Sequence, residues 1–448
     1  MAFLERLGNF IWNPWLLGCF LLVGLYFSVR TGFFQIFSCP LWLKTTLGSI
    51  LRPRRREKSK KGLTQLQAMA TALASTIGTG SIAGVAAAIF YGGPGAVFWM
   101  WISALLGMMT GCVEKILAVR YRERGENGWQ GGPMCYMERG LGSRFLAVWF
   151  SASCLAASLE ASLGWNRLAV GVVLALLTGA VMLGGVGRIG RVSEGLVPCM
   201  ALLFLGGGAV VLAVNARALP GALGAIVEGA FCPQAALGGS MGYTVSAAMR
   251  YGVARGVFTN EAGMGSSAIA HAAADVREPG EQGMWGIFEV FVSTVLVCGV
   301  SALVILTTGV YQPETALAAI QEGAVTSEML GAPLSAAAFS TVLGPAGEAL
   351  VTACLLLFAF TSLLGWSYFG ERSLSCLLGG RRLQGVYRGV FVAAIAAGSV
   401  IDVSAVWQLA DICNGLMALP NLCALLLLAP EGLGLLEEWA AHRKDGQK

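Results

Sequence analysis

The chain has 448 residues, of which 56% are hydrophobic and 12% are charged, and its mean hydropathy is +0.69. Soluble proteins carry about 25% charged residues, so this composition excludes a soluble globular domain and indicates a polytopic membrane protein. The formal net charge of +5 comes from Lys and Arg in the segments between apolar runs. We therefore expect a lipid bilayer around the chain and no nucleic-acid partner.

The 12 cysteines are scattered singly through apolar segments, without a CxxC pair or a Cys/His cluster. This pattern supports neither a disulfide framework nor a metal centre. The sequence also lacks a Ser/His/Asp set and a Walker loop. We therefore expect no cofactor and no enzymatic activity.

Apolar runs bounded by loop signals predict an all-α integral membrane protein with about 11 transmembrane helices. The predicted spans lie near residues 11–30, 66–90, 95–119, 145–164, 168–186, 191–214, 240–274, 284–309, 346–370, 387–401 and 403–429. We expect residues 1–62 to form an extra N-terminal span with a basic loop, and residues 63–214 and 215–429 to form two five-helix repeats. Residues 430–448 would form a cytoplasmic tail.

Basic residues predict how the spans are oriented. The loop LRPRRREKSKK (51–61) is the most basic in the chain, whereas residues 310–345 contain no Lys or Arg. Because Lys and Arg accumulate in cytoplasmic loops, the N-terminus would lie outside the cell membrane and the C-terminus in the cytoplasm. Arg250 and Arg255 do not fit this scheme.

Two glycine motifs interrupt predicted spans at corresponding places. Residues 78–83 and 263–268 both read G-x-G-S-x-A. Each glycine costs a helix interior about 1 kcal/mol relative to alanine, so the motifs predict two discontinuous helices. Five spans separate them, and an odd number reverses the orientation, which predicts an inverted repeat of the leucine-transporter type. Close helix packing through small residues is the alternative.

An interrupted membrane helix leaves N–H groups at one half-helix end and C=O groups at the other. The positive N-terminal end suits a carboxylate, and the carbonyl end suits a hard cation or an ammonium group. This arrangement predicts a zwitterionic amino acid and a cation as ligands.

Five segments resemble the alanine or glycine:cation symporter family over essentially the whole chain. They are TALASTIGTGSIAGVAAAIFYGGPGAVFWMWISALLGM (71–108), GGPMCYMERGLG (131–142), RYGVARGVFTNEAGMGSSAIAHAAA (250–274), FTSLLGWSYFGE (360–371) and LADICNGLMALPN (409–421). The resemblance implies a sodium-coupled transporter of small amino acids with the leucine-transporter fold. The chain would be a divergent member, because Ser81, Glu160 and Ser293 stand where the family usually has Asn, Gln and Asp.

The motifs and the resemblance together imply the site. Substrate contacts are expected from Gly78, Thr79, Gly80, Ser81, Glu160, Gly263, Met264, Gly265, Ser266 and Trp366. Sodium would bind among Ala74, Ile77, Thr361 and Ser362. Alternatives remain: a neutral, hydrogen-bonded Glu160, an interfacial anchor role for Trp366, and back-bonding of the Thr361 and Ser362 hydroxyls to their own helix. Asn260, Glu261 and His271 are expected to satisfy freed backbone groups.

We therefore expect a secondary active symporter that imports an alanine- or glycine-like amino acid with sodium by alternating access. Proton coupling or altered specificity is the first alternative. Relative to the family pattern, a hydroxyl replaces an amide at Ser81, an acid replaces an amide at Glu160 and a hydroxyl replaces an acid at Ser293. A channel is disfavoured by the inverted repeat. The sequence leaves the oligomeric state open.

Overall fold

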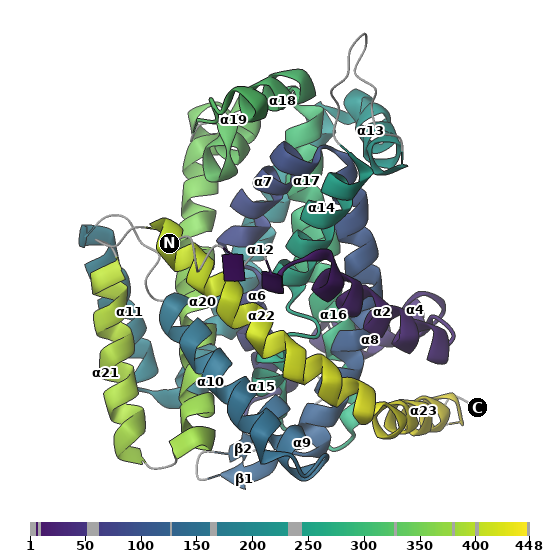
Figure 1. The fold of residues 1–448 in the computed structure, drawn as a ribbon, viewed down its shortest axis with the longest axis vertical. Coiled ribbons are helices and arrows are strands. Elements are labelled where there is room, and N and C mark those ends of the chain that lie inside the picture. Colours follow the sequence, from purple (N-terminus) through teal and green to yellow (C-terminus); the bar gives the residue numbers. More distant parts are fainter. Residues whose placement is uncertain are drawn as a thin grey trace.

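The computed structural model describes residues 6–7, 10–51, 62–125, 128–161, 168–231, 244–326, 329–378, 381–398 and 403–445. The described elements are mainly helices, and one short β-hairpin accompanies them (Figure 1). The N-terminal part holds α2 (Pro14–Arg30), α3 (Phe34–Phe37), α4 (Cys39–Thr45) and α5 (Leu47–Leu51). The basic segment 52–61 lies outside the described residues.

Four described helical stretches are long and apolar enough to cross a bilayer: α8 (Gly95–Arg120), α12 (Gly185–Val214), α20 (Pro345–Leu378) and the continuous run Pro279–Thr307. That run consists of α16 (Pro279–Val290), η3 (Phe291–Cys298) and α17 (Gly299–Thr307). A fifth span results if α22 (Val403–Leu427) and α23 (Ala429–Asp445), bent by 64°, are counted together. Other predicted spans coincide with shorter helices: α2, α10 (Arg144–Ala161), α11 (Leu168–Met182) and α21 (Arg381–Gly398).

The outer surface carries large apolar side chains, which suits contact with lipid. Exposed examples are Leu22, Phe145, Leu176, Leu202 and Leu427. In water such a surface would be costly, because each exposed apolar group forgoes the free energy of burial. The protein is therefore an all-helical membrane protein with several apolar spans.

The structure confirms both interruptions that the glycine motifs predict. The first broken helix comprises α6 (Gln65–Thr76), the 3₁₀ turn η1 (Thr79–Ser81) and α7 (Ala83–Gly92). The second comprises α14 (Val245–Asn260) and α15 (Ser266–Ala272). Because α6 packs on α15 while α7 packs on α14, the two broken helices run in opposite directions, as Figure 1 shows.

Several helices occupy segments to which the sequence analysis assigned no span. They are η2 (Ala216–Ala218), α13 (Leu219–Phe231), α18 (Pro313–Glu322) and α19 (Gly331–Leu343), and α13, α18 and α19 gather at one end of the molecule in Figure 1. The expected C-terminal tail is also mostly helical, as α23. These helices escaped the span analysis because α13, α18 and α19 are shorter than the roughly 20 residues that a span requires.

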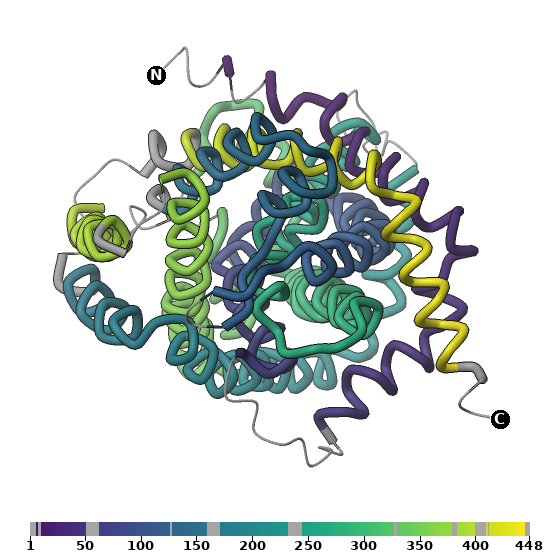
Figure 2. The backbone as a smooth tube through the Cα atoms, turned by 90° about the horizontal axis from the view of Figure 1, so that it is seen from below, coloured from purple at the N-terminus to yellow at the C-terminus, as the bar shows by residue number. Residues whose placement is uncertain are grey.

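The other end of the molecule carries the hairpin β1 (Glu123–Gly125) and β2 (Gly128–Gln130), followed by α9 (Pro133–Arg139). The strands pair antiparallel, with Glu123 opposite Gln130. Between the two ends lies one large apolar core. Seen from below, α11 and α21 form a pair at one edge (Figure 2), and a smaller apolar cluster that includes Leu174, Leu363 and Phe391 fixes this pair to α20.

At the hairpin end, the tips of α6 and α15 are joined by backbone hydrogen bonds. Leu63 N donates to Ala273 O at 3.2 Å, and Asp275 N donates to Leu63 O at 2.7 Å. The guanidinium of Arg122 donates to the carbonyls of Ala274 and Val276 and lies 4.2 Å from the Trp129 ring centroid. Partial burial lowers the pKa of Arg122 to about 10, so it stays charged at neutral pH.

Candidate functional site

The first break begins where α6 ends. A capping box starts α6, in which Thr64 Oγ1 accepts from Gln67 N and Gln67 Oε1 accepts from Thr64 N, both at 3.1 Å. Its last cap bond runs from Ile77 N to Leu73 O at 2.8 Å. The final carbonyls of a helix have no partner within it, so the carbonyl end of α6, including Ala74, faces the break.

The residues of the break are accessible to different degrees. Gly78, Thr79 and Gly80 are partly exposed, whereas Ile77, Ser81 and Ile82 are fully buried. Two turn-type bonds hold the 3₁₀ segment: Ser81 N to Gly78 O at 3.0 Å and Ile82 N to Thr79 O at 3.2 Å. The break therefore borders a space that solvent reaches, which a ligand site requires.

Helix α20 passes directly beside the end of α6. A Cβ at Gly365 would lie 2.9 Å from Ser75 Cβ, so only glycine permits this approach. A Cβ at Gly78 would lie 3.0 Å from Ser362 Oγ. The structure thus brings Ser362 to the first break, next to the carbonyl end of α6.

Thr361 and Trp366 have partners of other kinds. Thr361 Oγ1 lies 3.0 Å from the carbonyl oxygens of Leu357 and Phe358 on its own helix, which is the back-bonding alternative. Trp366 is buried, and its carbonyl accepts a hydrogen bond from Ser158 Oγ at 2.6 Å. Burial of the Trp366 ring disagrees with a role as an interfacial anchor.

The second break is buried throughout. Glu261, Gly263 and Gly265 have φ angles of 52°, 88° and 91°, in the left-handed region that favours glycine. Met264 is 1% exposed, and its N–H donates to Glu261 O at 3.0 Å. A Cβ at Gly265 would lie 2.6 Å from Pro133 Cγ and 2.7 Å from Phe150 Cε2, so this turn is tightly packed.

Side chains support the second break. Among the three residues expected to satisfy freed backbone groups, only Asn260 bonds to the backbone, whereas Glu261 and His271 bond to other side chains. Asn260 Oδ1 accepts from Ala262 N at 2.9 Å, and the Ser266 hydroxyl donates to the Glu261 carboxylate. From α22, Asn421 Nδ2 donates to Gly263 O at 2.9 Å. The break therefore keeps its shape through bonds within the protein.

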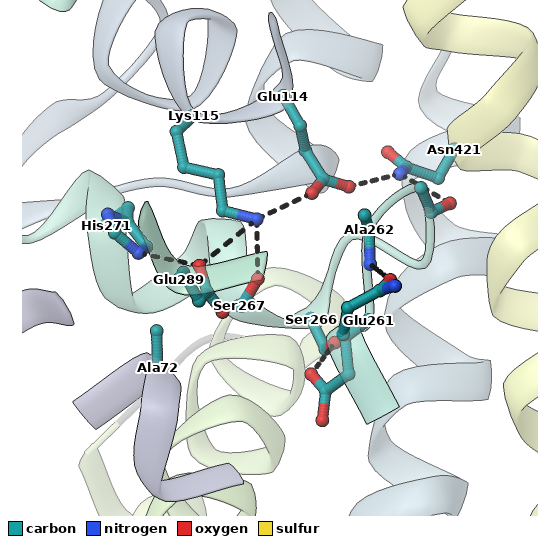
Figure 3. A network of polar contacts seen from close by, with 12 residues as sticks. Ala72, Glu114, Lys115, Glu261, Ala262, Ser266, Ser267, His271, Glu289 and Asn421 are labelled. Atoms are coloured by element: carbon teal, nitrogen blue, oxygen red, sulfur yellow. Dashed lines mark hydrogen bonds and ion pairs between the residues drawn. The ribbon is translucent and has the colours of Figure 1, made fainter. Parts of the chain in front are cut away.

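A buried ionic network surrounds this break (Figure 3). Lys115 Nζ lies 2.9 Å from Glu114 Oε2, 2.7 Å from Ser267 Oγ and 3.5 Å from Glu289 Oε2. Asn421 Nδ2 also donates to Glu114 Oε1 at 2.6 Å. Lys115, Glu114 and Glu289 have no exposed side-chain surface, so the single ammonium group is the counter-charge that the two carboxylates share within the protein.

His271 completes the network as a hydrogen-bonding residue. Gln282 Nε2 lies 2.6 Å from His271 Nδ1, and His271 Nε2 lies 3.1 Å from Glu289 Oε2. Since the amide nitrogen of Gln282 can only donate, we assign the Nε2–H tautomer, which donates to Glu289. Within the described ranges, no group of three His, Cys, Asp or Glu side chains is placed to hold a metal ion.

The sequence analysis missed the charged members of this network. Glu114, Lys115 and Glu289 all fall inside predicted spans, and an ionisable residue within a span is a signal of function by itself. It also left Arg255 without a role. In the structure, Arg255 on α14 lies against Gly80 and Gly84 of the first broken helix.

Of the two divergent positions other than Ser81, only Ser293 has a described side chain, and it belongs to η3 (Phe291–Cys298), which packs against η1 of the first break. Glu160 falls in the last turn of α10, and its side chain lies outside the described residues. Ser293 is buried in η3, a π-helical segment within the Pro279–Thr307 run. Such π segments are frequent at functional sites, because they shift side chains out of α-helical register.

Comparison with known proteins gives a family for this architecture. The model of the sodium:alanine symporter family matches residues 1–448. The chain is 40% identical over 444 residues to an uncharacterized transporter of Haemophilus influenzae, covering 95% of this chain and 93% of that protein. It is 37% identical over 449 residues to the sodium/alanine symporter AgcS of Methanococcus maripaludis, covering 96% and 95% of the two chains.

Two further similarities are weaker or more distant. A probable sodium/glutamine symporter, GlnT of Bacillus subtilis, is 34% identical over 454 residues, covering 98% of this chain and 90% of that protein. A crystal structure of a manganese transporter mutant from Eremococcus coleocola aligns with a TM-score of 0.47 at 16% identity, covering 85% and 80% of the two chains. The full-length sequence matches decide the assignment: the chain belongs to the sodium:alanine symporter family, whose members are membrane transporters rather than enzymes.

Proposed function

We propose that the protein imports a small neutral amino acid, alanine or glycine or a near relative, together with sodium. The observation that carries this proposal is the pair of antiparallel broken helices, of which the first borders accessible space and has Ser362 beside it. Secondary transporters place substrate and coupling ion at such breaks, near the bilayer midplane. Membership in a sodium-coupled amino acid symporter family supports the same reading.

The substrate carboxylate would meet amides near Thr79 to Ile82, at the positive end of α7. Within this range the amides of Ser81 and Ile82 already donate to turn carbonyls, which leaves those of Thr79 and Gly80 for the substrate. The amine would face carbonyls of the second break, from Gly263 to Ser266, with Met264 as an apolar contact. Trp366 would wall the pocket and limit it to small side chains. Its burial on the helix that passes α6 agrees with this role.

Sodium would bind where α20 meets the end of α6, as the second transported species. The donors there would be oxygens: the carbonyls of Ala74 and Ile77 and the hydroxyl of Ser362. Hard cations prefer such ligands. The Thr361 hydroxyl, expected as a further ligand, bonds to its own helix instead. Ser362 Oγ is buried and has no hydrogen-bond partner within the described part of the chain, as expected of an atom that receives an ion.

Alternating access would move the two broken helices relative to the rest of the protein around this site. In the cell membrane, the hairpin end would face the cytoplasm and the end with α13, α18 and α19 would face outward. The basic residues of the hairpin region, among them Arg122, Arg124 and Arg139, support this orientation.

The test measures thermal stability of the purified protein with L-alanine, glycine and L-glutamine, each in sodium chloride and in choline chloride. A ligand at 100 times its Kd stabilises the folded state by about 2.7 kcal/mol. We expect stabilisation by alanine or glycine in sodium only, and sodium-driven uptake in liposomes. Stabilisation only by L-glutamine, or uptake driven by a pH gradient without sodium, would overturn the proposed substrate or ion.

A further inference from the structure

Arg255 reaches from α14 across to the first broken helix. A Cβ at Gly80 would lie 1.9 Å from its Nη2, and a Cβ at Gly84 would lie 2.1 Å from its Nη1. The guanidinium therefore occupies the space that side chains at these two positions would need. This contact gives Gly80 and Gly84 a specific reason to be glycine: the Arg255 head group lies directly on their backbone.

The head group is held in place from its own helix. Arg255 Nε donates to Thr259 Oγ1 at 3.3 Å, and Thr259 Oγ1 in turn donates to Arg255 O at 2.8 Å. The two terminal nitrogens lie at Gly80 and Gly84, on either side of the start of α7. Arg255 is partly exposed, as are Gly80, Ala83 and Gly84, so solvent reaches this contact.

The electrostatics of this place favour an anion. The first N–H groups of α7 give its N-terminus about half a positive charge, and the guanidinium adds a full positive charge beside it. Ser81 lies two residues before the start of α7 and is fully buried, and its hydroxyl makes no hydrogen bond to a nitrogen or oxygen atom among the residues described. Backbone N–H groups, a guanidinium and a hydroxyl are the donors that a carboxylate accepts.

We propose that Arg255 binds the carboxylate of the transported amino acid at the start of α7 and thereby selects substrates that carry a free carboxylate. This inference rests on the proposed function and adds to it the specificity-determining side chain. An analogue whose carboxylate is replaced by a neutral amide would leave the guanidinium without its ionic partner. The site should therefore reject the amide of an amino acid that it binds.

The experiment compares L-alanine with L-alaninamide, and glycine with glycinamide, as ligands in sodium chloride at pH 7. Apparent affinities come from the concentration dependence of thermal stabilisation. Wild type should bind the amino acid about 10- to 100-fold more tightly than its amide, the range for a hydrogen bond to a charged group. Arg255→Gln should lower affinity for the amino acid by that factor, leave the amide unchanged, and bring the ratio close to one.

A second variant approaches the same contact from the other side. In Gly84→Ala the new Cβ would displace the flexible end of Arg255, so we expect the same selective loss of amino acid affinity. Because both changes remove one interaction, the double variant should bind L-alanine no more weakly than Arg255→Gln alone. Arg255→Lys, which keeps the charge without the two-pronged geometry, should be intermediate.

Two matched controls separate this effect from general damage. Arg250→Gln removes an exposed arginine from the same helix, and Gly206→Ala adds a methyl group where no atom lies within 4 Å. Both control variants should keep the wild-type ratio of amino acid affinity to amide affinity. If Arg255→Gln does not fold, Gly84→Ala provides the measurement.

The inference is overturned if folded Arg255→Gln or Gly84→Ala keeps the wild-type ratio of amino acid to amide affinity. Equal loss for both ligands would show a structural role and would overturn it as well. A wild-type protein that binds none of the amino acids would instead contradict the proposed function, and the inference with it. Wild-type binding with an unchanged ratio in the variants contradicts only the role of Arg255.

Discussion

Each of the two broken helices leaves backbone N–H and C=O groups without helical partners, and the two breaks differ in how these groups are satisfied. At the second break, side chains of Asn260, Glu261 and Asn421 bond to the turn or hold it in place, and Lys115 joins the surrounding carboxylates. The first break is partly exposed and is held by two turn-type bonds. Beside it lie the hydroxyls of Ser81 and Ser362, which bond to no nitrogen or oxygen atom in the part of the chain that the structure describes. The second break keeps its shape through side-chain bonds within the protein and would offer a ligand only backbone carbonyls, whereas the first break also has side-chain hydroxyls to offer.

This difference predicts which measurement each region affects. Buried polar groups that lose a partner cost stability, because nothing replaces the bond. Groups that bond to a ligand and not to the protein have a different effect, because removing them lowers the affinity for that ligand. Changes at the second break should therefore lower the free energy of unfolding, and changes at the first should weaken sodium or substrate binding.

The largest expected effect is that of Lys115→Met at the second break. Removing the ammonium leaves Glu114 and Glu289 buried without their shared counter-charge, which costs about 3–5 kcal/mol in comparable sites. Thermal unfolding and size-exclusion profiles of the purified variant measure it. The exposed Lys44, changed to Met, is the control. A Lys115→Met protein as stable as wild type would show that the network does not anchor the break.

Asn421→Ala should have a moderate effect. It removes the donor to Gly263 O and to Glu114 and leaves both acceptors buried, at a cost of about 1–3 kcal/mol each. Asn215→Ala is the control, since the Asn215 amide bonds to Val211 O on the preceding turn and lies near the surface. Weakened amino acid binding at unchanged stability would contradict this prediction and would assign Asn421 to substrate binding instead of to stabilising the second break.

Ser362→Ala should leave stability within about 0.5 kcal/mol of wild type. The sodium concentration for half-maximal stabilisation should rise about tenfold, as for the loss of one interaction of about 1.4 kcal/mol. Ser367→Ala on the same helix is the control, because Ser367 Oγ already bonds to Leu364 O at 2.8 Å. An unchanged sodium dependence would place the ion elsewhere.

The sequence alone predicted both breaks, because the G-x-G-S-x-A motif occurs in both predicted spans and its glycines have a known helical cost. It did not distinguish Thr361 from Ser362. Adjacent residues on a helix point about 100° apart, and the rotation of α20 about its axis depends on packing. In the structure, Thr361 Oγ1 lies 3.5 Å from Met200 Sδ, while Ser362 faces Gly78.

The contacts of Arg255 and Lys115 could not be predicted from the sequence, for a related reason. The sequence analysis noted Arg255 only as a charge that did not fit the predicted orientation, and it did not single out Lys115, although an ionisable residue inside a span is a signal of function. Their partners, Gly80 and Gly84 for one and Glu289 for the other, are far away along the chain. A sequence without aligned relatives does not reveal which distant helices meet, so the partners emerged only from the fold.

The backbone bonds between Leu63 and the residues around Ala274 tie the tips of α6 and α15 at the hairpin end. A motion that opens a passage between these tips must break both bonds and let water solvate four polar atoms. A motion that carries α6 and α15 as one body keeps them intact. Hydrogen exchange at the amide of Asp275 would therefore distinguish separation of the tips from joint movement during the transport cycle.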